Sequence, residues 1–205
     1  DIRLNFNEMI AAGLLSHIDF KVTGVRNGAK GDHSVSINLD GQSDYVASEF
    51  NKNLAGKDIT VELWLLAGGH RSGTIFSQGD LNNSMELSLT SDDHLQVKVG
   101  SKSILSDQPV NVQQGQWAHV AMEYNATQHT VSAFYNFVEV IHNVSVDAYS
   151  GIGPFVFGRS ISKQGDYLAA QIHGARIWSK IVTPINLQVR SLTLLSGSED
   201  GLLAY

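Results

Sequence analysis

The sequence contains no cysteine, and only three of its 205 residues are proline. Without cysteine the chain has no disulfide bond, no thiolate metal site and no cysteine nucleophile. A chain of this length does not need disulfides, because it buries a large enough core as one domain. The 19 glycines beside three prolines are typical of a chain with many tight turns.

Positive charge and long apolar runs are also scarce. Fourteen Lys and Arg residues face 20 Asp and Glu residues, which gives a net charge of -6 without a basic cluster. We therefore expect no nucleic-acid partner and no attraction to anionic lipid. No apolar run approaches the ~20 residues that cross a bilayer, so we expect no membrane insertion. The opening residues, DIRLNF, lack the pattern of a signal peptide.

What the sequence does contain is a series of short strand patterns separated by turn residues. Alternating or β-branched segments predict strands at residues 58–66, 84–90, 94–100, 129–135 and 153–158. No regular alternation of strands with helices appears, so the predicted fold class is all-β.

These strands offer one apolar face and one polar face. In the first of them Ile59, Val61, Leu63 and Leu65 share one face, and Thr60, Glu62 and Trp64 share the other. The same alternation in residues 84–90 places Glu86 on a polar face. Two antiparallel sheets packed through their apolar faces explain this pattern.

One segment near the C-terminus departs from the strand pattern. Thr183 suits an N-cap, Pro184 suits the first helical position, and Ile185, Val189 and Leu192 recur at helical spacing. We expect one short helix that lies against the sandwich.

The order of five segments resembles a known family. Residues 39–48, 58–68, 115–136, 153–160 and 172–189 are similar to laminin-G-like, concanavalin A-like jelly-roll domains of the bacterial type, which share the shape of pentraxins. The resemblance covers about residues 35–192, and IRLNF at residues 2–6 resembles the family's first strand. It implies a two-sheet antiparallel jelly-roll sandwich.

The chain departs from the family pattern at two places. Members often carry Asp-Gly in the hairpin where this chain has Asn136 and Phe137, and an acidic residue where it has His173. The ending EDGLLAY resembles a connection between such modules. We therefore expect a jelly-roll domain at residues 1–196 and a tail or linker at residues 197–205, within a larger secreted or cell-surface protein.

Enzymes share this fold, so catalysis must be argued from a site. The resembling laminarinase-like enzymes use a Glu-x-Asp-x-x-Glu strand, which is absent, and Asp92 and Asp93 after Glu86 suit a turn. We interpret His119, near Trp117, as a sheet histidine. A Ser-His-Asp triad stays open, although the sequence has no Gly-x-Ser-x-Gly motif. We expect no catalytic residue.

Calcium is an open candidate as a cofactor, because resembling domains often bind it through loop oxygens. The loop acids that suit this role are Asp40, Asp44, Asp80, Asp92, Asp93 and Asp166. No subset has a diagnostic spacing, so the metal ligands stay unknown.

A sugar site requires an aromatic platform and planar polar groups. We expect Trp64, Glu62 and Glu86 to share the face that points away from the core. Loop residues that suit a rim around them are His70, Arg71, Asp80, Asn82 and Asn83. We expect Trp117 and Trp178 to serve packing.

Phe137 and Val138 place apolar side chains where a hairpin tip is expected. If this tip exists, the two residues form a partner contact; otherwise they are ordinary strand residues.

Together these features predict a non-catalytic module that binds a glycan or glycoprotein. The alternative is a structural spacer or protein-protein adhesion domain that contacts only neighbouring domains or proteins. A weaker alternative is a glycoside hydrolase or lyase.

Overall fold

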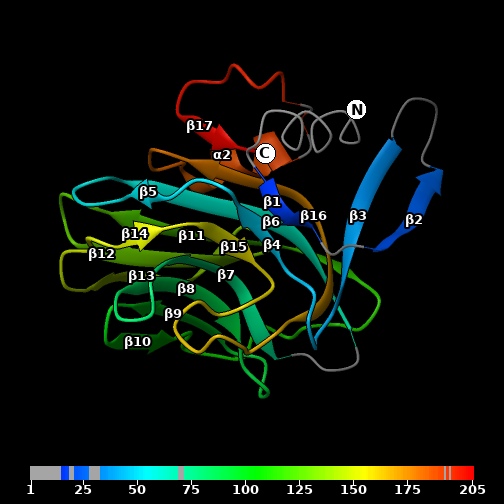
Figure 1. Ribbon diagram of the computed structural model, residues 1–205, viewed down its shortest axis with the longest axis horizontal. Coiled ribbons are helices and arrows are strands. Elements are labelled where there is room, and N and C mark those ends of the chain that lie inside the picture. The colour runs from blue at the N-terminus through cyan, green and yellow to red at the C-terminus, as the bar shows by residue number, and fades with distance from the viewer. Residues whose placement is uncertain (1–14, 19–20, 28–32, 69–71, 192, 194) are drawn as a thin grey trace.

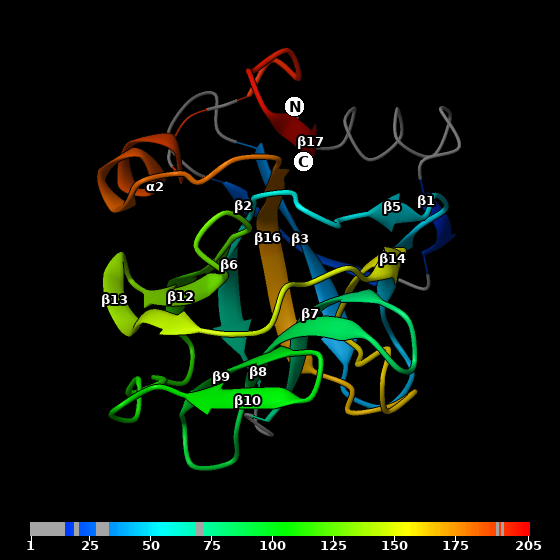
Figure 2. The same ribbon diagram turned by 90° about the vertical axis from the view of Figure 1, so that its left-hand side faces the viewer.

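The computed structural model describes residues 15–18, 21–27, 33–68, 72–191, 193 and 195–205. Two antiparallel sheets pack face to face, as Figures 1 and 2 show from two sides. The strand predicted at residues 2–6 and the predicted helical residue Leu192 lie outside the described residues.

The first sheet has seven strands in the order β1-β4-β15-β7-β8-β9-β10. In chain order they are Leu15–Ile18 (β1), Val46–Ser48 (β4), Gly73–Gly79 (β7), Ser84–Leu89 (β8), Leu95–Val99 (β9), Lys102–Leu105 (β10) and Phe155–Phe157 (β15).

The second sheet has eight strands, with the order β13-β12-β11-β6-β16-β3-β2 and with β17 also paired to β16. They are Lys21–Asn27 (β2), His33–Asp40 (β3), Ile59–Ala67 (β6), Trp117–Asn125 (β11), Thr130–Tyr135 (β12), Val138–Ser145 (β13), Ala169–Trp178 (β16) and Leu202–Ala204 (β17). A separate ribbon pairs Lys52–Asn53 (β5) with Ile152–Gly153 (β14).

The chain crosses repeatedly between the two sheets, from β6 to the run β7 to β10, back to β11 to β13, and then through β15 to β16. This connection pattern confirms the predicted jelly-roll sandwich. The predicted strands correspond to β6, β8, β9, β12 and β15, with ends shifted by a residue or two.

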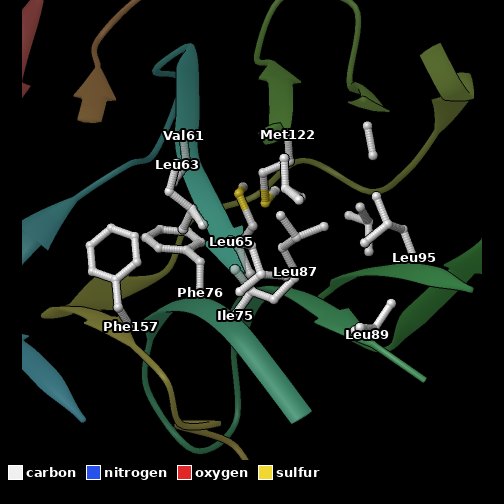
Figure 3. Close-up of a cluster of buried hydrophobic side chains, with 14 of the residues drawn as sticks. Val61, Leu63, Leu65, Ile75, Phe76, Leu87, Leu89, Leu95, Met122 and Phe157 are labelled. Carbon is white, nitrogen blue, oxygen red and sulfur yellow. The ribbon is translucent and has the colours of Figure 1, made fainter. Parts of the chain in front are cut away.

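The apolar faces of the two sheets form the core, and the alternation read from the sequence correctly assigns its residues. Leu63 and Met122 from the second sheet meet Phe76 and Leu87 from the first (Figure 3). Each of these four side chains is at most 1 % exposed. Burying such a side chain contributes about 1.5–3 kcal/mol, so this core is the main source of stability.

A second, smaller apolar cluster lies on the outer side of the eight-stranded sheet. Helix α2, Pro184–Ser191, packs there, and the cluster consists of Ala121, Phe134, Trp178, Val182 and Leu187. The predicted helix is confirmed, and the Leu187 amide donates to the Thr183 carbonyl at its first turn. Its buried contact is Leu187, whereas Ile185 and Val189 are 71 % and 66 % exposed.

The C-terminal residues add to the second sheet. In β17, Ala204 pairs with Ile177 of β16, so part of the expected tail belongs to the sandwich in this structure. A following module stays a prediction. Among the described residues, no helix is both long and apolar enough to cross a membrane.

Candidate ligand-binding site

The polar residues that the sequence groups into one face lie on opposite sides of the sandwich. Glu62 and Trp64 belong to β6 in the eight-stranded sheet, and Glu86 belongs to β8 in the seven-stranded sheet. Each of the three points away from the shared core, because its neighbours in the strand point into it. The prediction of one shared face is therefore wrong: strand alternation shows that a residue points outward, but not from which sheet.

Glu62 lies in a buried polar cluster on the outer side of β6. Its Oε2 accepts a hydrogen bond from His119 Nε2 at 2.9 Å, and its Oε1 accepts one from Trp178 Nε1 at 2.9 Å. The Arg176 guanidinium lies 3.9 Å from Oε1. Because the Glu62 side chain is 1 % exposed and its oxygens are engaged, it holds the sheet together and does not face a ligand.

Trp64 is partly covered by the hairpin between β12 and β13. The Phe137 ring lies 6.0 Å from the Trp64 ring and stacks on His119 at 4.4 Å. Trp64 Nε1 donates to the Ser191 carbonyl of α2 at 3.4 Å. Trp64 therefore packs between the hairpin and the helix, although part of its surface stays exposed.

The predicted hairpin tip is confirmed. Asn136 and Phe137 have φ values of 48° and 67°, both in the left-handed region, as the two central residues of a type I′ turn require. Phe137 folds back onto His119, while Val138 is 64 % exposed. The two residues expected to act together in a partner contact thus differ in exposure, and only Val138 projects.

Glu86 is held by hydroxyl and amide donors. Oε1 accepts from Ser84 Oγ at 2.8 Å and from the Ser162 amide at 3.2 Å, and Oε2 accepts from Ser160 Oγ at 3.0 Å. Burial raises the pKa of Glu86, but hydrogen bonds from Ser162, Ser84 and Ser160 outweigh it and leave the pKa below its ordinary value. Glu86 is thus a buried, ionised carboxylate with its oxygens occupied.

The predicted rim residues are only partly brought together. Asp80, Asn82 and Asn83 share the β7–β8 turn, where Asp80 Oδ1 accepts from the backbone amides of Asn82 and Asn83 at 2.8 and 3.0 Å. The Asn83 side chain donates to Ser150 Oγ. These contacts form the turn itself. Residues 70 and 71, the predicted His70 and Arg71, lie outside the described residues.

The loop acids considered for calcium also form turns. Asp40 accepts hydrogen bonds from the backbone amides of Ser43, Asp44 and Gln42, and these bonds lower its pKa to about 2. Asp166 accepts from Thr74 and Lys163. In the part of the chain that the structure describes, no three His, Asp or Glu side chains form a group suited to a metal ion. Calcium binding therefore stays an open prediction without a candidate site.

An open hollow lies where the loop between β10 and β11 passes the β12–β13 hairpin. Its volume is about 390 Å³. The lining residues are Pro109, Val110, Asn111, Gln113, Gln116, Trp117, Ala118, Tyr135, Asn136, Val138 and Val140. A second cavity, between the sheets, is apolar and measures only about 50 Å³, which is too small for a sugar ring.

One side of the hollow carries amides. Asn111, Gln113 and Gln116 are exposed, and no other described residue hydrogen-bonds to their side chains. Each side-chain amide offers two N–H donors and a carbonyl acceptor. Unlike Glu62, Glu86 and the β7–β8 turn, these groups therefore keep their hydrogen-bonding capacity for a ligand.

Backbone contacts hold this loop in place and do not involve the side chains of Asn111, Gln113 and Gln116. The Val110 amide donates to the Asp93 carbonyl at 2.8 Å, and the Gln116 amide donates to the Gln113 carbonyl at 3.3 Å. Asn111 and Gly115 have φ values of 49° and 77°, which turn the loop over the hairpin. The amides are therefore presented from an anchored segment.

Most of the other lining residues of the hollow are apolar or aromatic. Val138 and Val140 come from β13, and Tyr135 ends β12 opposite Val138. Ala118 and Val110 are each 6 % exposed and also line the hollow. Apolar side chains and side-chain amides in one hollow match the two kinds of surface of a sugar ring, its C–H patch and its hydroxyls.

Sequence reasoning missed this hollow. Trp117 was expected to serve packing, and its ring does lie 6.2 Å from that of His173, but Trp117 is partly exposed and lines the hollow. Trp178 is fully buried, as expected. The available signal was the run of amide residues in 111–116, directly before a tryptophan.

Comparisons with known proteins agree on the fold. The sequence model of the laminin G 3 family, described as the concanavalin A-like lectin/glucanases superfamily, matches residues 40–188. A search of curated protein sequences gave no match.

Among solved structures, a candidate carbohydrate-binding protein from Bacteroides ovatus has a TM-score of 0.63 at 18 % identity, covering 86 % of this chain and 56 % of that one. A pentraxin from Limulus polyphemus has a TM-score of 0.60 at 18 % identity, covering 84 % and 92 %. Domain 4 of an extracellular arabinanase from Geobacillus stearothermophilus, in complex with arabinotriose, has a TM-score of 0.60 at 16 % identity, covering 87 % and 90 %. At these identities the likeness concerns the fold.

Proposed function

Because this chain belongs to the concanavalin A-like lectin/glucanases superfamily, we propose that it is a non-catalytic module that binds glycan chains in the hollow beside the β12–β13 hairpin. The observation that carries the proposal is the set of exposed, unengaged amides at Asn111, Gln113 and Gln116, which line one hollow together with the apolar Val138 and Val140. Carbohydrate-binding neighbours of the same fold, one solved with arabinotriose, support it.

The hollow has the size and the chemistry for a sugar residue or two. Pockets that bind small ligands measure roughly 300–1,000 Å³ and combine apolar walls with a few polar groups. The volume of about 390 Å³ lies near the lower end of that range. A module with a shallow, open site of this kind retains a longer glycan through one or two of its units.

The carboxylates of the outer faces do not support hydrolysis. A glycosidase needs an acid and a base or nucleophile ~5–9.5 Å apart in a space that holds the sugar. Glu62 and Glu86 have their oxygens engaged by neighbouring donors. Burial raises the pKa of Glu123 to about 7, but neither Glu123 nor Glu139 lines either cavity.

Such a module fits a secreted or cell-surface protein in which it holds a neighbouring domain near its glycan. The exposed side chain of Val138 then contacts the C–H surface of the sugar and not a protein partner. A role as a spacer or adhesion domain predicts no glycan binding at all.

Binding is tested on a glycan array, followed by calorimetry with the strongest hits. We expect the double variant Gln113→Ala/Gln116→Ala to weaken binding about tenfold to a hundredfold, because each lost hydrogen bond contributes about 0.5–1.5 kcal/mol. Asn82→Ala and Trp64→Ala test the surfaces predicted from sequence, and we expect both to bind as the wild type does.

Three results contradict the proposal. No binding across many glycans favours the spacer role. Release of reducing sugar from a polysaccharide, lost in Glu86→Gln or Glu123→Gln, makes the chain a hydrolase. If instead Asn82→Ala or Trp64→Ala abolishes binding and the double variant does not, the glycan lies on one of the surfaces predicted from sequence.

A further inference from the structure

We propose that the hollow selects uncharged sugars and rejects glycans whose contacting unit carries a carboxylate or a sulfate. This inference rests on the proposed function and adds the chemical class of the ligand. It follows from the lack of lysine and arginine in the segment that builds the hollow and from the negative charge of a neighbouring residue.

No residue that lines the hollow, among those the structure describes, carries a charge. All of the lining residues fall within the segment 109–140. The longer stretch 103–158 contains no lysine and no arginine, whereas it contains the acids Asp107, Glu123, Glu139 and Asp147. The segment that builds the hollow therefore supplies no cation for an anionic sugar.

The charge of Asp93, which acts on one lining residue of the hollow, is negative. Asp93 carries the carbonyl that anchors the Val110 amide. Burial raises the pKa of Tyr135, and the negative charge of Asp93 raises it further, so Asp93 acts on a side chain of the lining. A carboxylate that enters the hollow meets this field unfavourably.

Lys102, the lysine that directly precedes this stretch in the sequence, is engaged elsewhere. Lys102 donates to the Ser145 carbonyl, at the end of β13 opposite to Val138. Seven residues of extended strand correspond to roughly 23 Å at about 3.3 Å per residue. At that distance an exposed charge is screened by salt at physiological ionic strength.

An anionic group therefore loses its water in the hollow without gaining a partner of opposite charge, which is unfavourable. Hydroxyl groups face no such penalty, because Asn111, Gln113 and Gln116 offer both donors and acceptors. Discrimination thus comes from missing cations as much as from the amides that are present.

The test uses matched pairs of glycans that differ by one charged group. The probes are lactose against 3′-sialyllactose, and a neutral oligosaccharide found on the array against its sulfated form, each titrated by calorimetry. We expect the anionic member of each pair to bind at least about tenfold more weakly, a difference of about 1.4 kcal/mol.

A gain-of-function variant tests the location. Gln113→Arg places a guanidinium among the lining residues, and we expect it to recover binding of the anionic member, since arginine pairs bidentately with carboxylate and sulfate. Gln128→Arg adds the same charge at the exposed β11–β12 turn and serves as the control. Gln116→Arg repeats the test from a second lining position, and thermal unfolding verifies that each variant folds.

The outcomes separate the two proposals. If neutral and anionic members bind the wild type equally, or the anionic member binds more tightly, the inference is wrong and glycan binding stands. Failure of both arginine variants to gain anionic binding places the sugar elsewhere and also overturns the inference. If no sugar binds, the proposed function fails and the inference fails with it.

Discussion

Glu123 is a buried carboxyl group, and we expect its replacement to raise the free energy of unfolding above neutral pH. It lies on the outer side of β11, 8 % exposed, and its Oε1 is buried with no hydrogen-bond partner among the described residues. Burial raises the pKa of Glu123 from 4.5 to about 7, and the nearby Glu139 carboxylate contributes to the rise. The native state therefore holds a proton that the unfolded chain releases at lower pH.

The sign and size of the effect follow from this difference. Below pH 4.5 both states are protonated and Glu123 costs nothing, whereas between pH 4.5 and about 7 stability falls as the unfolded state ionises first. A difference of about 2.5 pH units, at about 1.4 kcal/mol each, sets an upper limit of about 3 kcal/mol above pH 7. Local relaxation and water entry reduce it, so we expect about 1–3 kcal/mol.

Glu123→Gln removes the charge and keeps the shape. At pH 8 we expect it to raise the melting temperature by about 2–12 °C, because about 1 kcal/mol corresponds to roughly 2–4 °C at this chain length. At pH 4 we expect no difference from the wild type. Thermal unfolding followed by circular dichroism between pH 4 and pH 9 measures both, with the exposed Glu49→Gln as a control. An equal gain at pH 4 and pH 8, or a loss at pH 8, refutes the reasoning.

Substitutions at three further residues test other parts of the structure. Phe137→Ala loses the stack on His119 and should lower the free energy of unfolding by about 2–3 kcal/mol. Phe137→Gly should lower it by about 1 kcal/mol less than Phe137→Ala does, because glycine adopts the φ of 67° without strain. Chemical denaturation compares the two variants. Arg176→Ala should lower the free energy of unfolding in urea by about 3–5 kcal/mol and make α2 more sensitive to proteolysis. The reason is that Arg176 donates hydrogen bonds to the carbonyls of Arg190 and Thr193 and balances the charge of buried Glu62. An equal loss in the exposed control Lys57→Ala would contradict this role. Asp40→Ala should lower the melting temperature at pH 7, with or without a chelator. The difference should disappear as the pH falls from 3.8 through about 2, because the lowered pKa of Asp40 contributes stability only above that window. An effect that depends on the chelator would instead indicate a bound cation.

The architecture was predictable because strand alternation is a local signal. The alternation assigns Leu63 and Leu65 to the core from their neighbours alone, and both are buried there. Thr183 and Pro184 predict the helix, but the sequence does not predict which side of it is buried. The helical spacing pointed to Ile185 and Val189, whereas the structure buries Leu187 and exposes both of them.

The site was not predictable because its environment comes from distant segments. Glu62 looks like a solvent-facing strand residue, but the Phe137 hairpin and α2, which begins more than 120 residues later, cover it. The hollow forms where the loop between β10 and β11 meets the β12–β13 hairpin, about 20 residues later in the chain. Such a contact produces no periodic pattern in the sequence. Alternation gives the direction of a side chain, not what later packs on it.

The central claim is that a glycan binds among the amides of the loop between β10 and β11. A crystal structure of the protein soaked with an oligosaccharide selected on the array tests it most directly. The account predicts a sugar ring between the side chains of Gln113 and Gln116 and those of Val138 and Val140, at positions that line the hollow. A sugar bound instead at the β7–β8 turn or against Trp64, with the hollow empty, would contradict it.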